Sequence, residues 1–116
     1  MQRSFRLTRS EDFKRVRRDG KSYAHPLVVL IVQSNEQGRL RVGVTAGKSV
    51  GTAVYRNRAK RLLREAMRTL IPNIASHTDL ILIARPALVS ASLADVRAAL
   101  INLLERARLF TPSHES

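Results

Sequence analysis

The sequence RLRVGVTAGKSVGTAVYRNRAKRLLREAMR, residues 39–68, contains a strand pattern, a glycine-rich turn and a helix pattern in succession. Apolar and polar residues alternate over 39–46, which is the two-residue period of a half-buried strand. From Thr52, a suitable N-cap, apolar residues recur at helical spacing to about Leu70, and Pro72 ends the pattern. A strand followed by such a helix predicts a domain in which helices pack against a sheet.

Two further elements are predicted before this segment. A short helix is expected over about 9–18, because TRSE, residues 8–11, has the form of a capping box. The apolar, β-branched run at 27–34 is typical of a buried strand. Only the turn-like residues 35–38 separate it from the alternating strand 39–46, so the two are predicted to pair as an antiparallel hairpin.

Two more elements are predicted after it. A third strand is expected over 79–86, and a last helix opens at Ser92. The apolar positions of this helix recur at helical spacing and comprise Leu93, Val96, Leu100, Leu103, Leu104 and Ala107. The order α-β-β-α-β-α predicts a single α+β domain over residues 1–116, a two-layer sandwich of a small sheet with helices. Residues 111–116 are expected to form a disordered tail.

The composition excludes several classes of protein. With 116 residues, 44% of them hydrophobic, the chain can bury one modest core. It has no cysteine, which excludes disulfides, thiolate zinc sites and cysteine nucleophiles and fits a reducing cytoplasm. No stretch approaches the roughly 18 to 20 apolar residues of a membrane span, and no apolar run follows the charged N-terminus as in a secretory signal. A cytoplasmic protein is therefore expected.

The net charge of +12 is concentrated in one part of the chain. Residues 1–71 hold 17 of the 21 Lys and Arg against five acidic residues, whereas residues 72–116 hold four of each sign. Self-repulsion on this scale destabilises a compact fold unless a polyanion neutralises it. Nucleic acid is the first candidate partner and an anionic membrane surface the second. A membrane is disfavoured because the apolar helix faces are needed for the core.

The predicted helix 52–70 has two distinct sides when successive residues are placed about 100° apart. The side expected to pack comprises Tyr55, Ala59, Leu62, Leu63, Ala66, Met67 and Leu70. The opposite side, here called the cationic face, comprises Asn57, Lys60, Arg61, Arg64 and Arg68. A solvated face usually mixes both signs, but this one places like charges four residues apart, where they repel. Phosphate contacts would turn that repulsion into attraction, so the cationic face is interpreted as a docking surface for nucleic acid.

Two other kinds of site are disfavoured by spacing. GVTAGKS, residues 43–49, looks like a phosphate-binding loop, but the nucleotide-binding pattern requires a glycine where Val42 stands. ATP or GTP hydrolysis is therefore not expected. The histidines, His25, His77 and His114, are too far apart in sequence to suggest a metal site, and the acidic residues include only one adjacent pair, at 11–12. No catalytic side chain and no protein-held metal are predicted.

The stretch KSVGTAVYRNRAKRLLREAMR, residues 48–68, closely resembles the signature of the protein subunit of bacterial ribonuclease P. The residues that match the signature are Lys48, Gly51, Ala53, Val54, Arg56, Asn57, Arg58, Lys60, Arg61 and Arg64. The opening helix, the strands and the closing helix also fall in the family's order. The resemblance implies the family's fold, in which an unusual left-handed crossover helix joins parallel strands, against the usual rule of handedness.

The resemblance also implies a function. A protein of this family binds the catalytic RNA of ribonuclease P and helps it remove the 5′ leader of precursor tRNA, while Mg²⁺ ions held mainly by the RNA perform the hydrolysis. The expected contacts to the RNA subunit are Arg56, Asn57, Arg58, Lys60, Arg61, Arg64, Arg68 and Lys48. The expected leader-binding cleft, between the first helix and the sheet, comprises Phe13, Arg9, Lys14, Arg17, Arg41 and Thr45.

This sequence departs from the family pattern in the cleft. Arg17 stands where relatives often carry a second aromatic residue, Val29 and Ile31 replace common aromatic residues, and Ser49 replaces a lysine. Leader binding is therefore expected to depend more on charge and less on stacking. Two alternatives stay open: Phe13 as a core aromatic, and the whole chain as a non-catalytic ribosomal or RNA-chaperone protein.

Overall fold

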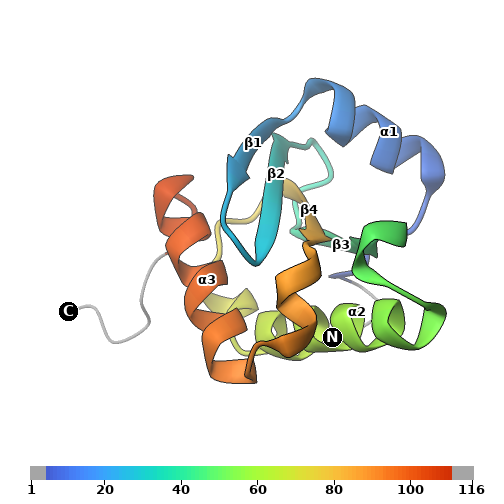
Figure 1. Ribbon diagram of the computed structural model, residues 1–116. Helices are drawn as coiled ribbons and strands as arrows, with labels where there is room; N and C mark the ends of the chain where they lie inside the picture. The colour runs from blue at the N-terminus through green and yellow to red at the C-terminus, as the bar shows by residue number, and fades with distance from the viewer. Residues whose placement is uncertain (1–4, 111–116) are drawn as a thin grey trace.

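The structure is a computed structural model that describes residues 5–110, within which the chain forms three α-helices and four strands (Figure 1). The elements are α1 (Ser10–Asp19), β1 (Lys21–Ala24), β2 (Val28–Ser34), β3 (Arg41–Ala46), α2 (Ala53–Arg68), β4 (Thr78–Ala84) and α3 (Leu93–Arg106). The α+β class is confirmed, and each predicted helix and strand is found. The short strand β1 was not predicted, because its four residues are mostly exposed and carry no apolar alternation. The predicted disordered tail, 111–116, lies outside the described residues.

The predicted hairpin is wrong, because β4 lies between the two strands expected to pair. The sheet order is β1-β2-β4-β3, with β2 antiparallel and β3 parallel to β4. All but one of the residues of β4 are buried, as is typical of a central strand covered on both faces. The segment before β4 also contacts the predicted turn. The backbone amide of Asn35 donates a hydrogen bond to the backbone carbonyl of His77 at 2.8 Å.

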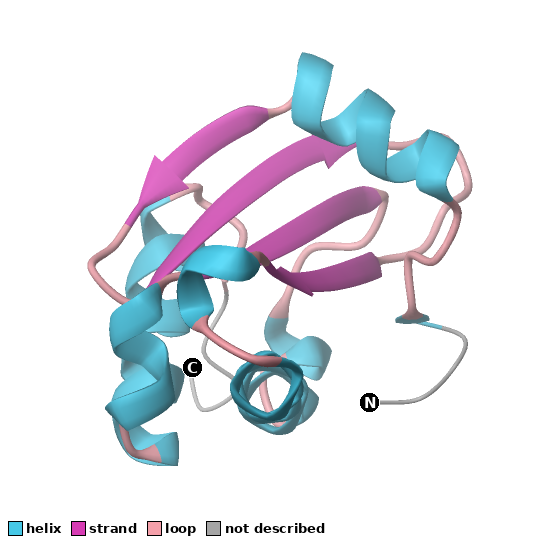
Figure 2. Cartoon of the chain, turned by 45° about the vertical axis from the view of Figure 1, so that its right-hand side comes forward, coloured by secondary structure: helices cyan, strands magenta, loops and turns pink. Residues whose placement is uncertain are grey.

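The two faces of the sheet carry separate apolar clusters. Alternate residues of β2 and β4, such as Leu30 and Leu82, pack with α2 and α3 in the larger cluster. Their neighbours Ile31 and Ile81 pack with Val16 of α1 in the smaller one. Figure 2 shows α1 on one side of the sheet and α2 and α3 on the other. Helices α2 and α3 thus form the main helical layer, and α1 covers part of the opposite face.

The segment before α1 runs along the edge of the sheet. Arg6 forms a parallel bridge with Val42, and the Leu7 amide donates to the Val42 carbonyl at 2.8 Å. Because these contacts hold the chain on β3, the predicted capping box does not form: α1 starts with Arg9 as its N-cap and without a side-chain cap. The predicted cap of α3 is confirmed, since the Ser92 hydroxyl accepts from the Asp95 amide at 3.0 Å.

Helix α2 connects the neighbouring parallel strands β3 and β4, so the βαβ unit of the resembled family is present. Its predicted N-cap position, Thr52, is confirmed, although the Thr52 side chain makes no capping hydrogen bond. The left-handed crossover stays an expectation from the family.

Candidate RNA interface

Helix α2 has the two sides that its sequence predicts. Ala59, Leu63, Ala66, Met67 and the following Leu70 are buried against the sheet, as predicted. On the opposite side, the cationic face is open to solvent: Asn57, Arg61 and Arg68 are exposed, and Lys60 and Arg64 are half-buried. The pattern therefore fixes the orientation of α2 and presents its positive charge outward.

Tyr55 and Leu93 depart from their predicted packing. Tyr55 is 51% exposed and Leu93 is 42% exposed, each in the first turn of its helix. Tyr55 covers the turn before α2, where Gly51 has a φ of 133°. A Cβ on Gly51 would lie 3.0 Å from Cδ2 of Tyr55. The helical period places a residue on a face but does not show where along the helix the core ends, which is why these two predictions fail.

Most charges of the cationic face lack an internal partner. Within residues 5–110, Arg68 is the only member that forms an ion pair, with Nη2 at 2.7 Å from Oε2 of Glu65. This hydrogen bond raises the pKa of Arg68 and lowers that of Glu65. Lys60, Arg61 and Arg64 make no such contact with the described residues, so their charges are available to an external polyanion.

The other predicted RNA-subunit contacts lie at the start of α2 or in the turn before it. Lys48 is exposed in a short 3₁₀ turn, Lys48–Val50, that packs against α2. Arg58 is exposed, and Arg56 is half-buried with its Nε hydrogen-bonded to none of the described residues. All eight predicted residues therefore belong to one continuous segment of the structure.

Phe13 lies at the boundary between core and solvent. Its half-buried ring packs on the smaller apolar cluster and against the backbone of Gly43, where an added Cβ would lie 2.4 Å from Cζ of Phe13. The ring also borders a cavity of about 220 Å³ that Arg64 of α2 lines as well. The predicted leader-binding residue and the cationic face thus meet at the β3 edge of the sheet.

The remaining predicted cleft residues differ in accessibility. Lys14 and Arg17 are exposed on α1, and Arg9 is exposed at its N-cap. Thr45 is half-buried on β3. Arg41 is the exception, because its guanidinium lies inside a network of ion pairs beneath α1.

Asp79, which sequence reasoning did not single out, is the centre of that network. Its carboxylate is fully buried and receives hydrogen bonds from Arg15 at 2.7 Å, from Arg41 at 2.9 Å through each of two nitrogens, and from Asn35 at 2.7 Å. Asp12 of α1 joins the network through Arg15, at 3.2 Å. The network therefore links α1 to β3, β4 and the loop after β2.

The electrostatics of Asp79 follow from these contacts. Burial would raise the pKa of Asp79, but hydrogen bonds from Arg41, Arg15 and Asn35 outweigh it, so the pKa is lowered. The carboxylate is charged at neutral pH and holds Arg41 in place. One signal in the sequence could have revealed it: an acid at the start of a strongly apolar strand needs a buried partner.

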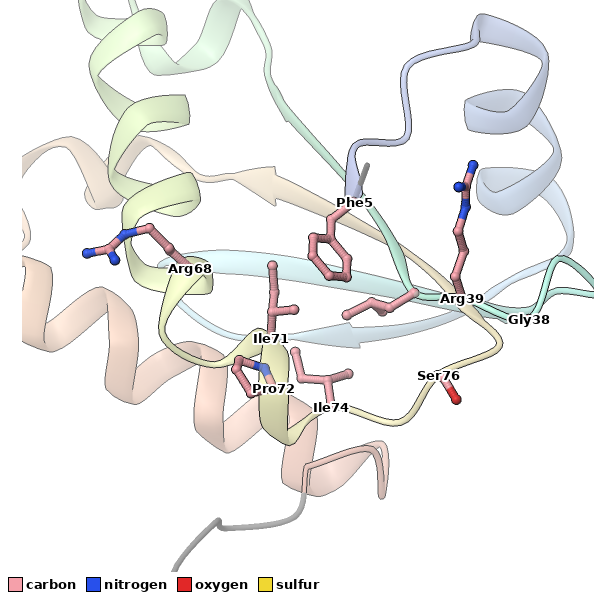
Figure 3. Close-up of a pocket in the computed structure, with 9 residues that line it drawn as sticks. Phe5, Gly38, Arg39, Arg68, Ile71, Pro72, Ile74 and Ser76 are labelled. Carbon is pink, nitrogen blue, oxygen red and sulfur yellow. The ribbon is translucent and has the colours of Figure 1, made fainter. Parts of the chain in front are cut away.

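An apolar cavity of about 560 Å³ lies near the C-terminal end of α2 (Figure 3). Phe5, Ile71 and Ile74 line it, while the guanidinium of Arg68 points away from it. Arg39 also lines it, and its guanidinium likewise points away, so this cavity does not extend the cationic face.

The chain matches known proteins over nearly its whole length. The family model for ribonuclease P matches residues 1–108. The chain belongs to the ribonuclease P protein family. A ribonuclease P protein is a subunit of a ribonucleoprotein endoribonuclease, so RNA binding and tRNA processing follow from this membership.

Individual ribonuclease P proteins support this membership. The protein component of Herpetosiphon aurantiacus is 43% identical over 110 residues, which cover 95% of this chain and 89% of the relative. The structure of the Staphylococcus aureus protein is similar with a TM-score of 0.80 at 28% identity, covering 92% of this chain and 98% of that one. The Thermotoga maritima protein has a TM-score of 0.78 at 30% identity, covering 87% and 96%.

The acidic and histidine side chains of the described residues are dispersed or paired. Residues 5–110 contain no group of three or more His, Asp or Glu side chains placed to hold a metal ion. Asp12 and Asp79 are paired with arginines. Among the same residues, no helix is long and apolar enough to cross a membrane.

Proposed function

We propose that this chain binds the catalytic RNA of ribonuclease P through the cationic face of α2 and binds the 5′ leader of precursor tRNA in the cleft between α1 and β3. The observation that carries the proposal is the absence of internal partners for Lys60, Arg61 and Arg64 within residues 5–110. Like charges spaced four residues apart repel, and phosphate groups would neutralise them. Arginine suits this role because its planar fork matches phosphate oxygens.

The leader is assigned to the α1 side because an aromatic ring and cations occur together there. Single strands are bound by stacking on aromatic rings within a positive groove, and stacking contributes roughly 1 to 3 kcal/mol per base. Phe13 supplies the ring, and the exposed Arg9, Lys14 and Arg17 supply the charge. Arg41 acts through the buried network, by holding α1 on the sheet.

The hydrolysis is assigned to Mg²⁺ ions held mainly by the RNA. Carboxylates that converge on a metal are the usual protein ligands for Mg²⁺, and the described residues do not offer such a group. The chain then contributes by binding and positioning RNA. We place this activity in the cytoplasm, where bacterial precursor tRNA is made.

The salt dependence of binding tests the docking surface. If about six side chains neutralise phosphates, the logarithm of affinity for the RNA subunit falls with the logarithm of salt concentration at a slope of roughly −4 to −5. Replacing the exposed Arg58 and Arg61 with alanine should make that slope less steep by about 1.5. A slope near zero for the wild-type chain would rule out the docking surface.

A further inference from the structure

Two arginines line the cavity of about 220 Å³ beside Phe13. It lies between α1, the β3 edge and α2, and its lining includes Arg6, Thr8, Phe13, Val42, Gly43 and Arg64. Its volume is roughly that of seven water molecules, at about 30 Å³ each. The cavity therefore has room for a small polar group but not for a folded peptide or RNA helix.

The backbone before α1 places the exposed Arg6 beside this cavity. Arg6 and Leu7 lie along β3, held by the bridge to Val42. Neighbouring residues of an extended chain point to opposite sides, and Leu7 is buried in the cluster beneath α1. Arg6 therefore points to the α2 side, where Arg64 lies.

The two arginines line the same cavity without a carboxylate partner among the described residues. No acidic residue lines the cavity, and neither arginine forms an ion pair with any residue in 5–110. Burial, and then repulsion from Arg6, lower the pKa of Arg64. Both effects are unfavourable in the free protein, and an anion in the cavity would relieve the repulsion.

We propose that this cavity, the Arg6–Arg64 pocket, binds one phosphodiester group of the single-stranded leader, next to a base that contacts Phe13, so that Arg64 contacts the leader while the other members of the cationic face contact the RNA subunit. Two guanidinium groups and the Thr8 hydroxyl are all donors suited to phosphate oxygens. The pocket lies at the edge strand, so a strand bound there passes from the α1 side of the sheet towards the cationic face. The inference rests on the proposed function, because it takes the leader as the bound strand.

Replacing Arg6 tests the pocket without altering the cationic face. In the complete ribonucleoprotein, Arg6→Ala should weaken binding of precursor tRNA with a leader about three- to tenfold, the effect of losing a single phosphate contact. It should leave binding of mature tRNA, which has no leader, unchanged. The matched control is Arg106→Ala, which removes the same charge beside β1, at the opposite edge of the sheet, and should change neither affinity.

A series of leaders with a single neutral methylphosphonate linkage identifies the phosphate. At one linkage position the wild type should lose affinity, and Arg6→Ala should cause no further loss, because both changes remove the same contact. Additive losses at every position would overturn the proposal. So would an Arg6→Ala effect of equal size on mature tRNA, which would assign the phosphate to the tRNA body.

Two further outcomes separate this inference from its alternatives. If inorganic phosphate occupies the pocket, seen as shifts of the arginine side-chain NMR signals, and leader RNA does not displace it, the pocket is a free-phosphate site and the proposal is wrong. If the wild-type chain enhances cleavage and Arg6→Ala matches it in every assay, the inference alone fails. A wild-type chain that does not enhance cleavage overturns the proposed function together with the inference.

Discussion

Gly43 determines where the ring of Phe13 can lie. The ring packs directly on the strand backbone, and an added Cβ would approach Cζ of Phe13 to 2.4 Å and Cε2 to 2.9 Å. Any larger residue must therefore push the ring towards solvent or bend β3 at the sheet edge. Since Phe13 also borders the Arg6–Arg64 pocket, the absence of a side chain at position 43 shapes the proposed leader-binding surface.

Gly43→Ala should lower the free energy of unfolding by about 1 to 3 kcal/mol through overpacking, and should weaken leader binding because Phe13 moves. Gly47→Ala is the matched control, because no atom lies within 4 Å of an added Cβ there. Urea unfolding of the two variants measures the difference. Equal stabilities would show that the contact of Phe13 with Gly43 imposes no constraint.

Asp79 connects α1 to the sheet by charge as well as by packing. Asp79→Asn should lower the free energy of unfolding by about 3 kcal/mol, because it leaves Arg15 and Arg41 without a buried counter-charge. Glu36→Gln, at an exposed residue that forms no ion pair within 5–110, should have little effect. Chemical unfolding at neutral pH compares the two variants. If Asp79→Asn left the free energy of unfolding unchanged, the network would contribute nothing to stability.

The lowered pKa of Asp79 also predicts how stability depends on pH. An aspartate with a lower pKa in the folded state contributes its full stabilisation above the unfolded pKa of about 3.9 and loses it as pH falls through the folded value. The wild type should therefore lose more stability than Asp79→Asn as the pH falls below about 4. Parallel losses in the two proteins over this range would contradict the assignment.

At the scale of elements, α2 shows which part of a site can be predicted from sequence. Its helical period correctly predicted both the packing side and the cationic face, because a long amphipathic helix against a sheet has one stable orientation. The period did not predict the exposure of Tyr55, because it does not specify where along the helix the core ends. The ion pair of Arg68 with Glu65, the only carboxylate contact of the face within 5–110, joins residues three apart, which the period does place side by side.

Glu65→Gln should strengthen binding of the RNA subunit by about two- to threefold and steepen its salt dependence. The substitution frees Arg68 and removes the only carboxylate that contacts the cationic face within residues 5–110. Glu105→Gln, at an exposed position of α3, is the control and should have no effect. Weaker RNA binding by Glu65→Gln would show that the ion pair, and not the free cation, is what the RNA recognises.

The helix starts offer a second comparison between predicted and observed contacts. Ser92→Ala should lower the free energy of unfolding by about 1 kcal/mol, because the hydroxyl caps the Asp95 amide. Thr52→Ala should cost less, because the Thr52 side chain makes no capping hydrogen bond. Equal losses in thermal or urea unfolding would contradict the observed caps.

At the scale of the whole molecule, strand order is the feature that the sequence predicted least well. Residues 35–38 have a turn-like composition, and the nearest strands are usually the first to be paired in a prediction. In the structure, β4 separates these strands and its Asp79 lies in register with Arg41. Local patterns predict the elements, but strand pairing depends on which strand can be buried on both faces. The hydrogen bonds of the buried Asp79 with Arg15 and Arg41 also favour the central position of β4.

The charge of the whole chain has a consistent location in the fold. Within residues 5–71, most of the cations lie on α1, on α2 and in or beside β3, so this charge belongs to the surface of the folded domain. The sequence could not show that the two proposed RNA-binding regions meet at the β3 edge. That proximity follows from the parallel pairing of β3 with β4 and from the backbone of Arg6 and Leu7 along β3.

The most direct test of the central claim is the single-turnover rate at which a bacterial ribonuclease P RNA removes the 5′ leader of precursor tRNA at low Mg²⁺ concentration, measured with and without this chain. We expect the chain to increase the rate, and the Arg58→Ala, Arg61→Ala double variant to require a higher protein concentration for the same increase while remaining folded. A rate that does not change when the wild-type chain is added would contradict the claim that this protein docks on the RNA and supports tRNA 5′ maturation.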